Sequence, residues 1–324
     1  MMVMKPIVSI IIPVYNVEAY IEDCLHSVSN QTIPELLECL VVDDCGCDNS
    51  ADIAKRYIES YTGKVKFQFV KREKNGGLSA ARNSGLRMAT GKYVYFLDSD
   101  DYIKPGAMET LLRLVNIYGD VDLIPALYIT EDNRDMSQFN KHSFPEFSDN
   151  QYLIKRSLLD YDCIPVTAAN RLIRRELLIE NNLWFKEGII HEDNYWTFFL
   201  AKFVKKMAFC SEKIYYYRTT PGSITNKINK EKEIAAFSTM INDFSHHIDN
   251  FYKGVQKKYI FLHLMIMWHN EYYHDIDEMK TVYRKFSTQC SLPEKVLMFF
   301  CVKTNGYLYA KFLNLLQRFF LLTK

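Results

Sequence analysis

Short apolar runs alternate with amphipathic segments along the first 130 residues of the chain. The run at 8–14 is apolar almost throughout, as expected for a strand buried on both faces, and shorter runs follow at 39–42, 65–70 and 93–97. Between them, segments such as 50–61 place apolar residues at helical spacing. This alternation predicts an α/β fold built on a doubly wound, mostly parallel sheet.

The alternation fades after residue 130. A fifth strand is expected at 123–129, at an edge of the sheet because Pro125 has no backbone donor. An aromatic helix is expected to open at His191, and a strand at 213–218. From residue 231 the pattern is helical and rich in aromatic residues and methionine. We therefore predict an α/β domain over 1–226 and a helical C-terminal region over 227–324.

Polar residues follow three of the predicted strands at their carboxyl ends. They are Tyr15-Asn16 after the first strand, Asp43-Asp44 after the second and the acidic run Asp98-Ser99-Asp100-Asp101 after the fourth. Parallel doubly wound sheets bind ligands at the carboxyl ends of their strands. The three strand ends together predict a binding site at this edge of the sheet.

The carboxylates of Asp98 and Asp100 are candidates for a divalent metal site, because Mg²⁺ and similar hard cations bind carboxylates together with substrate phosphates. Such a cation neutralises charge that develops on a leaving diphosphate. The alternative is an acidic turn before the helix that Pro105 opens, where negative charge is favourable.

Two further motifs carry candidate chemistry. Asn75 to Asn83 contains two glycines that allow close backbone approach, and Arg82 supplies donors for a phosphate or a base. The alternative is an ordinary glycine-opened helix with a solvated arginine. Glu192 and Asp193 offer a carboxylate that deprotonates an acceptor hydroxyl, although acidic residues also suit a helix N-terminus.

Composition narrows the function classes. The 324 residues have a formal net charge of +1, which gives no overall argument for nucleic-acid binding. The eight cysteines are scattered, and only Cys45 and Cys47 lie close together, so we expect reduced thiols and no disulfide framework. No uncharged stretch reaches the roughly 18 residues of a membrane span, and the first apolar run is too short for a signal peptide. A cytosolic protein is expected.

Four motifs, in this order and spacing, resemble the family 2 glycosyltransferases of GT-A fold. They are Val8–Asn16, Val41–Asp44, Ser79–Gly85 and Tyr93–Asp101, and Glu192-Asp193, Tyr217-Arg218 and Gly222–Thr225 extend the resemblance to about residue 225. The family's members transfer a sugar from a nucleotide-sugar. The resemblance implies a Rossmann-like nucleotide-sugar half over 1–105 and an acceptor half over 106–226.

The resemblance also implies roles for individual residues. Asp193 would be the catalytic base of an inverting transfer, Asp100 would bind Mn²⁺ or Mg²⁺ with help from Asp98, and Asp44 would accept from the nucleotide base. The implied contacts to the nucleotide-sugar are Pro13, Val14, Tyr15, Asn16, Asp44, Asn75, Arg82, Asp98, Ser99 and Arg218. One departure is Cys45-Gly46-Cys47-Asp48, where the family usually has Gly-Ser-Thr-Asp or a close variant.

Several functional alternatives are weighed against this resemblance. A processive polymer synthase is disfavoured, because none of Trp184, Trp196 and Trp268 ends a Gln-x-x-Arg-Trp motif. A nucleotidyltransferase is disfavoured, because the loop after the first strand lacks glycine and basic residues. A non-catalytic nucleotide-sugar-binding protein is the main alternative, and the intact Asp98, Asp100 and Asp193 argue against it. UDP is the expected donor nucleotide, and surface polysaccharide synthesis the expected setting.

The last stretch of the chain predicts a basic amphipathic helix. Lys311, Asn314, Gln317 and Arg318 share one helical face, and the opposite face is lined by Leu308, Phe312, Leu315, Leu316, Phe319 and Phe320. Such a helix can lie at a membrane surface, which would suit a lipid-linked saccharide acceptor and a peripheral position on the inner face of the cell membrane. Packing on the protein itself or on a second copy in a homodimer is the alternative for residues 293–324.

Overall fold

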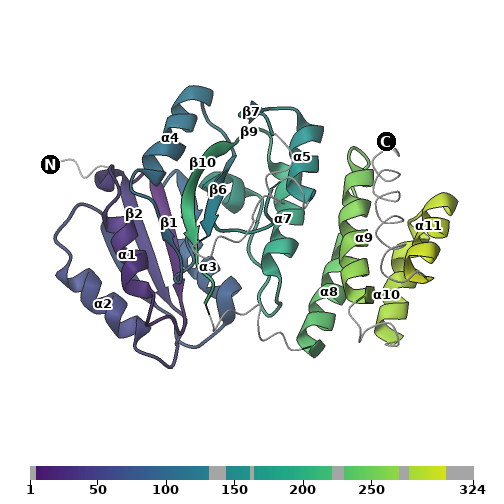
Figure 1. Ribbon diagram of the computed structural model, residues 1–324, viewed down its shortest axis with the longest axis horizontal. Helices are drawn as coiled ribbons and strands as arrows, with labels where there is room; N and C mark the ends of the chain where they lie inside the picture. Colours follow the sequence, from purple (N-terminus) through teal and green to yellow (C-terminus); the bar gives the residue numbers. More distant parts are fainter. Residues whose placement is uncertain (1–4, 131–143, 161–163, 221–229, 270–276, 304–324) are drawn as a thin grey trace. The chain divides into compact units, whose positions relative to one another are not determined.

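The computed structural model describes all residues except 1–4, 131–143, 161–163, 221–229, 270–276 and 304–324 (Figure 1). Its internal contacts divide the chain into two compact units. One compact unit comprises residues 1–188 and 192–226, and the other comprises residues 189–191 and 227–324. The predicted Gly222–Thr225 motif and the predicted helix within 305–324 lie outside the described residues.

The first unit holds a ten-stranded mixed sheet. Its strands are β1 (Val8–Val14), β2 (Leu37–Asp43), β3 (Lys66–Lys71), β4 (Tyr93–Phe96), β5 (Tyr102–Ile103), β6 (Leu123–Thr130), β7 (Phe147–Ser148), β8 (Arg171–Arg174), β9 (Met207–Ala208) and β10 (Cys210–Tyr217). Its helices are α1 (Ile21–Ser29), α2 (Ser50–Ser60), α3 (Gly77–Met88), α4 (Ala107–Tyr118), α5 (Gln151–Leu159), α6 (Arg175–Glu180) and α7 (Glu192–Phe203), with a 3-10 turn at Pro34–Leu36.

The order of the first four strands brings the polar strand ends together. The sheet runs β3-β2-β1-β4, and each of these neighbouring pairs is parallel. Every residue of β1, β2 and β4 is buried, because helices such as α1 and α3 flank this part of the sheet (Figure 1). The carboxyl ends of β1, β2 and β4 therefore meet at one edge, as the sequence predicts.

The second half of the sheet departs from the expected pattern. Strand β8, which sequence analysis did not assign, runs antiparallel between β4 and β6. The prediction that 123–129 forms an edge strand is wrong, because β6 lies inside the sheet between β8 and β10. Pro125 is tolerated there because it falls between Leu123, which pairs with β9, and Ala126, where β10 begins to pair. A missing donor at that gap removes no ladder hydrogen bond on that side of the strand.

The second unit is helical in the part that the structure describes. Its helices are α8 (Lys230–Ser245), α9 (Lys253–His269), α10 (Asp277–Thr288) and α11 (Leu292–Lys303). Buried Phe244, Tyr259 and His263 pack their rings together between α8 and α9. None of the described helices combines the length and apolar character that crossing a membrane requires.

Candidate active site

The acidic run after β4 is tied to strand β10 through Tyr215. The backbone N–H of Asp98 donates to the Tyr215 hydroxyl at 3.3 Å, and that hydroxyl donates to the Asp101 carboxylate at 2.7 Å. Asp101 also accepts from the backbone N–H of Arg218 at 2.8 Å. Burial, followed by the charge of Asp98, raises the pKa of Asp101 to about 8. Asp101 therefore joins the two strand ends and is not available to a ligand.

Asp98 and Asp100 are the members of the run that suit a cation. Burial and the neighbouring Asp98 charge raise the pKa of Asp100, and Thr220 donates to its carboxylate at 3.3 Å. A divalent cation would relieve the repulsion between the two carboxylates. Within the described residues, no group of three or more His, Cys, Asp or Glu side chains is arranged to hold a metal. The donor set therefore fits a cation that also binds diphosphate or water oxygens.

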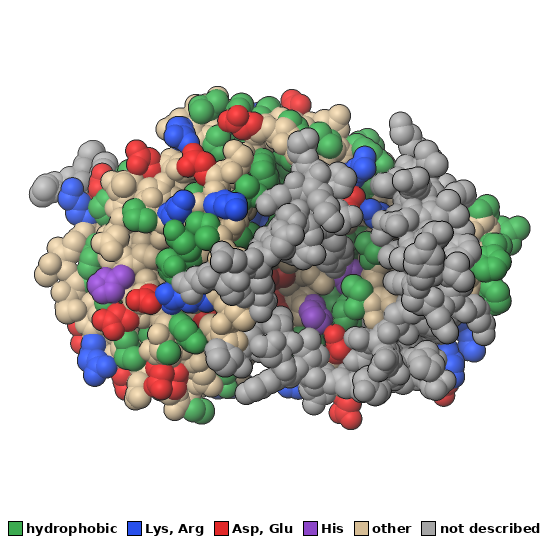
Figure 2. All heavy atoms as spheres, viewed as in Figure 1, with side chains coloured by type: hydrophobic (Ala, Val, Ile, Leu, Met, Phe, Trp, Pro, Cys, Tyr) green, Lys and Arg blue, Asp and Glu red, His purple; other side chains and the backbone are tan. Residues whose placement is uncertain are grey.

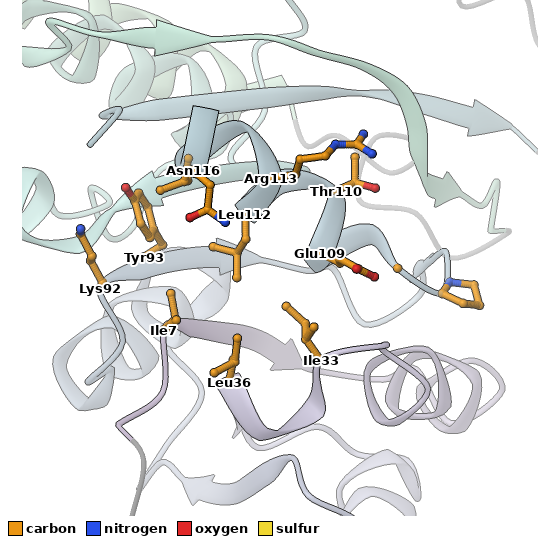
Figure 3. A pocket seen from close by; sticks show the side chains of 13 residues that line it. Ile7, Ile33, Leu36, Lys92, Tyr93, Glu109, Thr110, Leu112, Arg113 and Asn116 are labelled. Atoms are coloured by element: carbon orange, nitrogen blue, oxygen red, sulfur yellow. The ribbon is translucent and has the colours of Figure 1, made fainter. Parts of the chain in front are cut away.

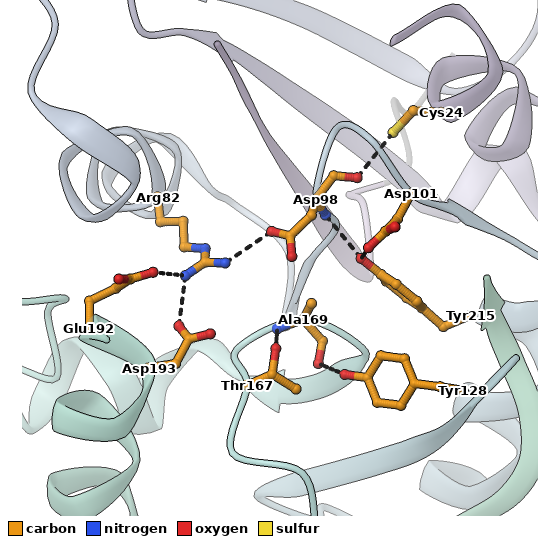
Figure 4. A network of polar contacts seen from close by, with 10 residues as sticks. All are labelled: Cys24, Arg82, Asp98, Asp101, Tyr128, Thr167, Ala169, Glu192, Asp193 and Tyr215. Atoms are coloured by element: carbon orange, nitrogen blue, oxygen red, sulfur yellow. Dashed lines mark hydrogen bonds and ion pairs between the residues drawn. The ribbon is translucent and has the colours of Figure 1, made fainter. Parts of the chain in front are cut away.

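Arg82 connects the strand-end carboxylates to helix α7 (Figure 4). Its side chain is only 1% exposed, its Nη2 donates to Asp98 at 2.9 Å, and its Nη1 donates to Asp193 at 2.7 Å and to Glu192 at 3.0 Å. The guanidinium also lies 5.2 Å from the centre of the Phe185 ring. Arg82 is thus a buried bridge among three carboxylates, and it does not lie on an open surface.

The two carboxylates at the start of α7 differ in environment. Burial, followed by the charge of Asp193, raises the pKa of Glu192 to about 7. Asp193 is 20% exposed and accepts from Arg82 through Oδ1, and no other described residue is in hydrogen-bonding contact with it. Its Oδ2 therefore remains for a substrate hydroxyl. Asp193 is therefore the better candidate for a proton acceptor. Glu192 is its neighbour and binds the same guanidinium.

Asp44 directly follows β2 and binds the loop that leads into α3. Its carboxylate accepts from the backbone N–H groups of Gly76 at 3.1 Å and Gly77 at 2.8 Å, and from the Asn75 side chain at 3.0 Å. Arg72 makes an ion pair with the same carboxylate. Asp44 and Asn75, both predicted to contact the nucleotide, therefore lie together, and Arg72 is a neighbour that sequence analysis missed.

The residues at and after the end of β1 differ in their exposure. Pro13 and Val14 are buried within the strand, whereas Tyr15 is 48% exposed beside Asn16. Asn16 adopts a left-handed backbone conformation, with φ of 54°, and its side chain accepts from the Cys47 N–H at 2.7 Å. A Cβ on Gly46 would lie 2.9 Å from the Asn16 nitrogen, so this close approach requires glycine. This contact, together with the bond from the Asp44 N–H to the Val14 carbonyl at 3.0 Å, joins the loops that follow β1 and β2.

The remaining predicted residues lie around the acidic run. Ser99 is buried, at 6% exposure. The Arg218 guanidinium stacks over Tyr102 at 4.5 Å and pairs with Asp23 at 2.8 Å. Thr220, Tyr215 and Tyr102 were not identified from the sequence; the tyrosine-rich run at 215–217 was the one available signal.

A cavity of about 710 Å³ lies away from these residues (Figure 3). It is lined by residues at the amino ends of β1 and β4, including Ile7 and Tyr93, and by α4 residues such as Leu112 and Arg113. The strand-end carboxylates lie at the opposite ends of the same strands. This cavity is therefore separate from the candidate active site.

Comparison with known proteins decides the family. Residues 9–181, more than half of the chain, match the family profile described as Glycosyl transferase family 2. The chain belongs to this family. The chain is similar to the putative glycosyltransferase EpsH of Bacillus subtilis (strain 168), at 30% identity over 243 residues, which cover 72% of this chain and 68% of EpsH. The protein is therefore a glycosyltransferase enzyme of family 2.

Other relatives are longer than the matched region. A poly(ribitol-phosphate) β-N-acetylglucosaminyltransferase, TarS of Staphylococcus aureus (strain Mu50), is 31% identical over 215 residues, which cover 65% of this chain and 35% of TarS. The chain thus matches about a third of TarS. A crystal structure of S. aureus TarS 1–349 with UDP-GlcNAc aligns with a TM-score of 0.71 at 20% identity, covering 97% of this chain and 91% of that one. This likeness confirms the GT-A fold that the sequence predicts.

Proposed function

We propose that this glycosyltransferase moves one sugar from a UDP-sugar to an acceptor hydroxyl with inversion at the anomeric carbon. The observation that supports it most is the Arg82 bridge, which holds the strand-end carboxylate Asp98 and the helix carboxylate Asp193 around one guanidinium. If Asp98 binds the donor and Asp193 accepts the proton, as we propose, this bridge supplies the positioning that a single displacement needs.

In this proposal Asp193 acts on the acceptor. Its Oδ2 accepts the proton of the acceptor hydroxyl as the new glycosidic bond forms and the bond from the anomeric carbon to the diphosphate breaks. Attack from the side opposite the leaving diphosphate inverts the anomeric carbon. Arg82 keeps the Asp193 carboxylate oriented through Oδ1, at 2.7 Å, and at the same time holds Asp98.

We assign Asp100, with Asp98, to a bound Mn²⁺ or Mg²⁺, which when present supplies positive charge to the leaving diphosphate. Support comes from the mutual repulsion of these two carboxylates. A mannosyltransferase structure from Pyrobaculum calidifontis with GDP-Man and Mn²⁺ shares the fold, with a TM-score of 0.59 at 18% identity. Arg218, which stacks on Tyr102, is assigned to the diphosphate as well.

The donor pocket is assigned to the walls around Asp44 in the half that spans residues 1–105, with the acceptor bound by the half that spans 106–226. The proposed contacts to the nucleotide are the backbone of Pro13 and Val14, the side chains of Tyr15, Asn16 and Asn75, and the Ser99 region of the acidic run. UDP is favoured because TarS was crystallised with UDP-GlcNAc and with UDP. A relative named as a minor teichoic acid biosynthesis protein, and TarS, named for its action on poly(ribitol-phosphate), favour a saccharide or lipid-linked acceptor in surface polysaccharide synthesis.

A thermal-shift panel of nucleotide-sugars with and without Mn²⁺ tests this proposal. We expect one UDP-sugar to raise the Tm by about 5 °C at roughly 100 times its Kd, and only with metal, because binding to the folded state adds its free energy to stability. Asp100→Asn should lose the metal-dependent part of the shift. Asp120→Asn is the matched control, since this carboxylate is exposed and pairs with Lys92. No response to any donor would contradict the proposal.

We also propose that residues 293–324 contact a membrane surface, which would place a cytoplasmic enzyme peripherally on the inner face of the cell membrane. Support comes from α11, where Val296, Phe299 and Phe300 are between 43% and 55% exposed and fall on one helical face. Hydrophobic side chains gather over α11 at the right-hand edge of Figure 2. The opposite face holds buried Glu294, which pairs with Lys257 at 3.0 Å. A homodimer contact through the same face is the alternative.

Replacing Phe299 and Phe300 together with glutamate should reduce binding to vesicles of phosphatidylglycerol and phosphatidylethanolamine by about tenfold or more, because two apolar rings no longer enter the interface. Flotation of the full chain with vesicles measures this. Phe251→Glu is the matched control, since Phe251 is equally exposed, at 59%, but lies before α9. Wild-type protein that stays off vesicles yet sediments as a dimer, which the double variant abolishes, would favour the homodimer contact.

A further inference from the structure

A second cavity lies within the helical unit, between α8 and α10. Its volume is about 590 Å³, within the range of small-molecule sites. Hydroxyl and amide side chains line much of it, together with two residues that can carry positive charge. The residues that matter for its chemistry are Ser238, Asn242, Ser245, Thr281, Lys285 and Thr288.

Three hydroxyl groups of this cavity already donate a hydrogen bond within the protein. Ser245, Thr281 and Thr288 each donate to a backbone carbonyl of their own helix, at 2.7 to 2.9 Å. Their protons are therefore used, and their oxygen lone pairs remain to accept from hydroxyl groups of a ligand. This surface is complementary to a molecule that carries several hydroxyls.

Ser238 differs from the other hydroxyls. It is 8% exposed, and among the described residues its Oγ has no hydrogen-bond partner although the side chain lines the cavity. A buried hydroxyl without a partner costs free energy, so a ligand atom that accepts its proton would be favoured. Ser238 is thus a donor in the wall of the cavity that has no partner among the described residues.

The charge of the cavity favours an anion. Lys285 extends from α10 and contacts the Asn242 side chain at 3.4 Å, a contact that leaves the ammonium most of its donors. No Asp or Glu is among the described residues that line the cavity, and His246 lies at its wall. A phosphate group would accept from both Lys285 and Ser238.

We propose that this cavity binds a phosphate ester of a polyol or sugar. The ligand's phosphate accepts from the Lys285 ammonium and the Ser238 hydroxyl, and its hydroxyl groups donate to Ser245, Thr281 and Thr288. The residues of this site all belong to the helical unit, and none of them takes part in the proposed transfer reaction. Its failure and the failure of the proposed function are therefore distinguishable.

Calorimetric titration of the full chain with sn-glycerol 3-phosphate, in the presence of saturating UDP and Mn²⁺, tests this proposal. We expect saturable binding, no binding of glycerol, and weaker binding of inorganic phosphate. Lys285→Gln should weaken binding by about tenfold or more, and Ser238→Ala by about threefold or more, because each removes a donor to the phosphate. Arg284→Gln should change nothing, since Arg284 is an exposed neighbour on α10 that does not line the cavity.

Three results would overturn the assignment of a phosphate site to this cavity. They are an absence of saturable binding by glycerol 3-phosphate, displacement of that ligand by UDP, and equal affinities in the Lys285→Gln and Arg284→Gln variants. Inorganic phosphate that binds as tightly as glycerol 3-phosphate would overturn the assignment to a polyol ester. Because Lys285 is exposed, its variant should melt with the wild-type profile, so lost binding reports on the site.

Discussion

Asp193→Asn is expected to lower kcat for sugar transfer by about 10³-fold or more while UDP binding stays within a few-fold of wild type. The amide keeps the size of the carboxylate but cannot take the proton of the acceptor hydroxyl, and general-base catalysis contributes about 10² to 10⁴ in rate. The carboxylates after β4, which we propose to bind the donor, are unchanged. Initial rates of UDP release, with nucleotide binding measured separately, give the two quantities.

Glu192→Gln is the matched control for this experiment. Glu192 accepts from the same Arg82 nitrogen as Asp193, at 3.0 Å against 2.7 Å, but is more deeply buried. We expect its substitution to lower kcat by less than about tenfold. A loss of rate in Glu192→Gln that matches Asp193→Asn, or an Asp193→Asn variant that keeps a tenth of the wild-type rate, would remove Asp193 from the base role.

Arg82→Met is expected to lower the free energy of unfolding by about 3–5 kcal/mol and to abolish transfer. Removing one partner of a buried ion pair leaves uncompensated charge, and here Asp98, Glu192 and Asp193 would all lose their shared cation. Chemical denaturation of the variant and of the wild type measures the difference. Arg82→Lys should recover only part of it, because an ammonium lacks the planar set of donors that reaches three carboxylates.

The pH dependence of the Arg82→Met variant separates lost charge from lost packing. Burial and the charge of Asp193 already raise the pKa of Glu192 above its unfolded value, and the Arg82 guanidinium lowers it, so losing the guanidinium raises this pKa further. Between these values the folded state binds more protons, and stability therefore falls as pH rises. We expect a smaller deficit near pH 5 than near pH 8. A deficit that is independent of pH would point to packing against Phe185 instead.

Local patterns were enough to predict the part of the fold that holds the site. Strands β1, β2 and β4 follow from their apolar runs, and the rule for parallel sheets places their polar carboxyl ends at one edge. Strand β8 was missed because its four residues, with arginine at both ends, show no apolar run. The edge position predicted from Pro125 was wrong because the effect of a proline depends on which neighbouring strand its nitrogen faces. Pairing between strands that are distant in the sequence decides that orientation.

The carboxylates of the site could be predicted from the sequence. The role of the cationic side chain that binds them could not. Arg82 was identified as a donor for a phosphate or a base, whereas the structure surrounds it with carboxylates from residues up to 111 positions away. Asn16 was predicted to contact the nucleotide, and in the structure its side chain accepts from the Cys47 N–H, 31 positions away. Both outcomes depend on tertiary contacts that no local sequence pattern contains.

The carboxylate of Asp44 at the start of α3 has a consequence for ligand design. The first amides of a helix are an attractive seat for a phosphate, but those of Gly76 and Gly77 already donate to Asp44. In the proposed function, a donor diphosphate therefore takes its counter-charge elsewhere, from a metal bound at Asp100 or from Arg218. An inhibitor with a neutral linker in place of the diphosphate would need no cation at the acidic run. Its affinity would therefore stay the same when the metal is chelated.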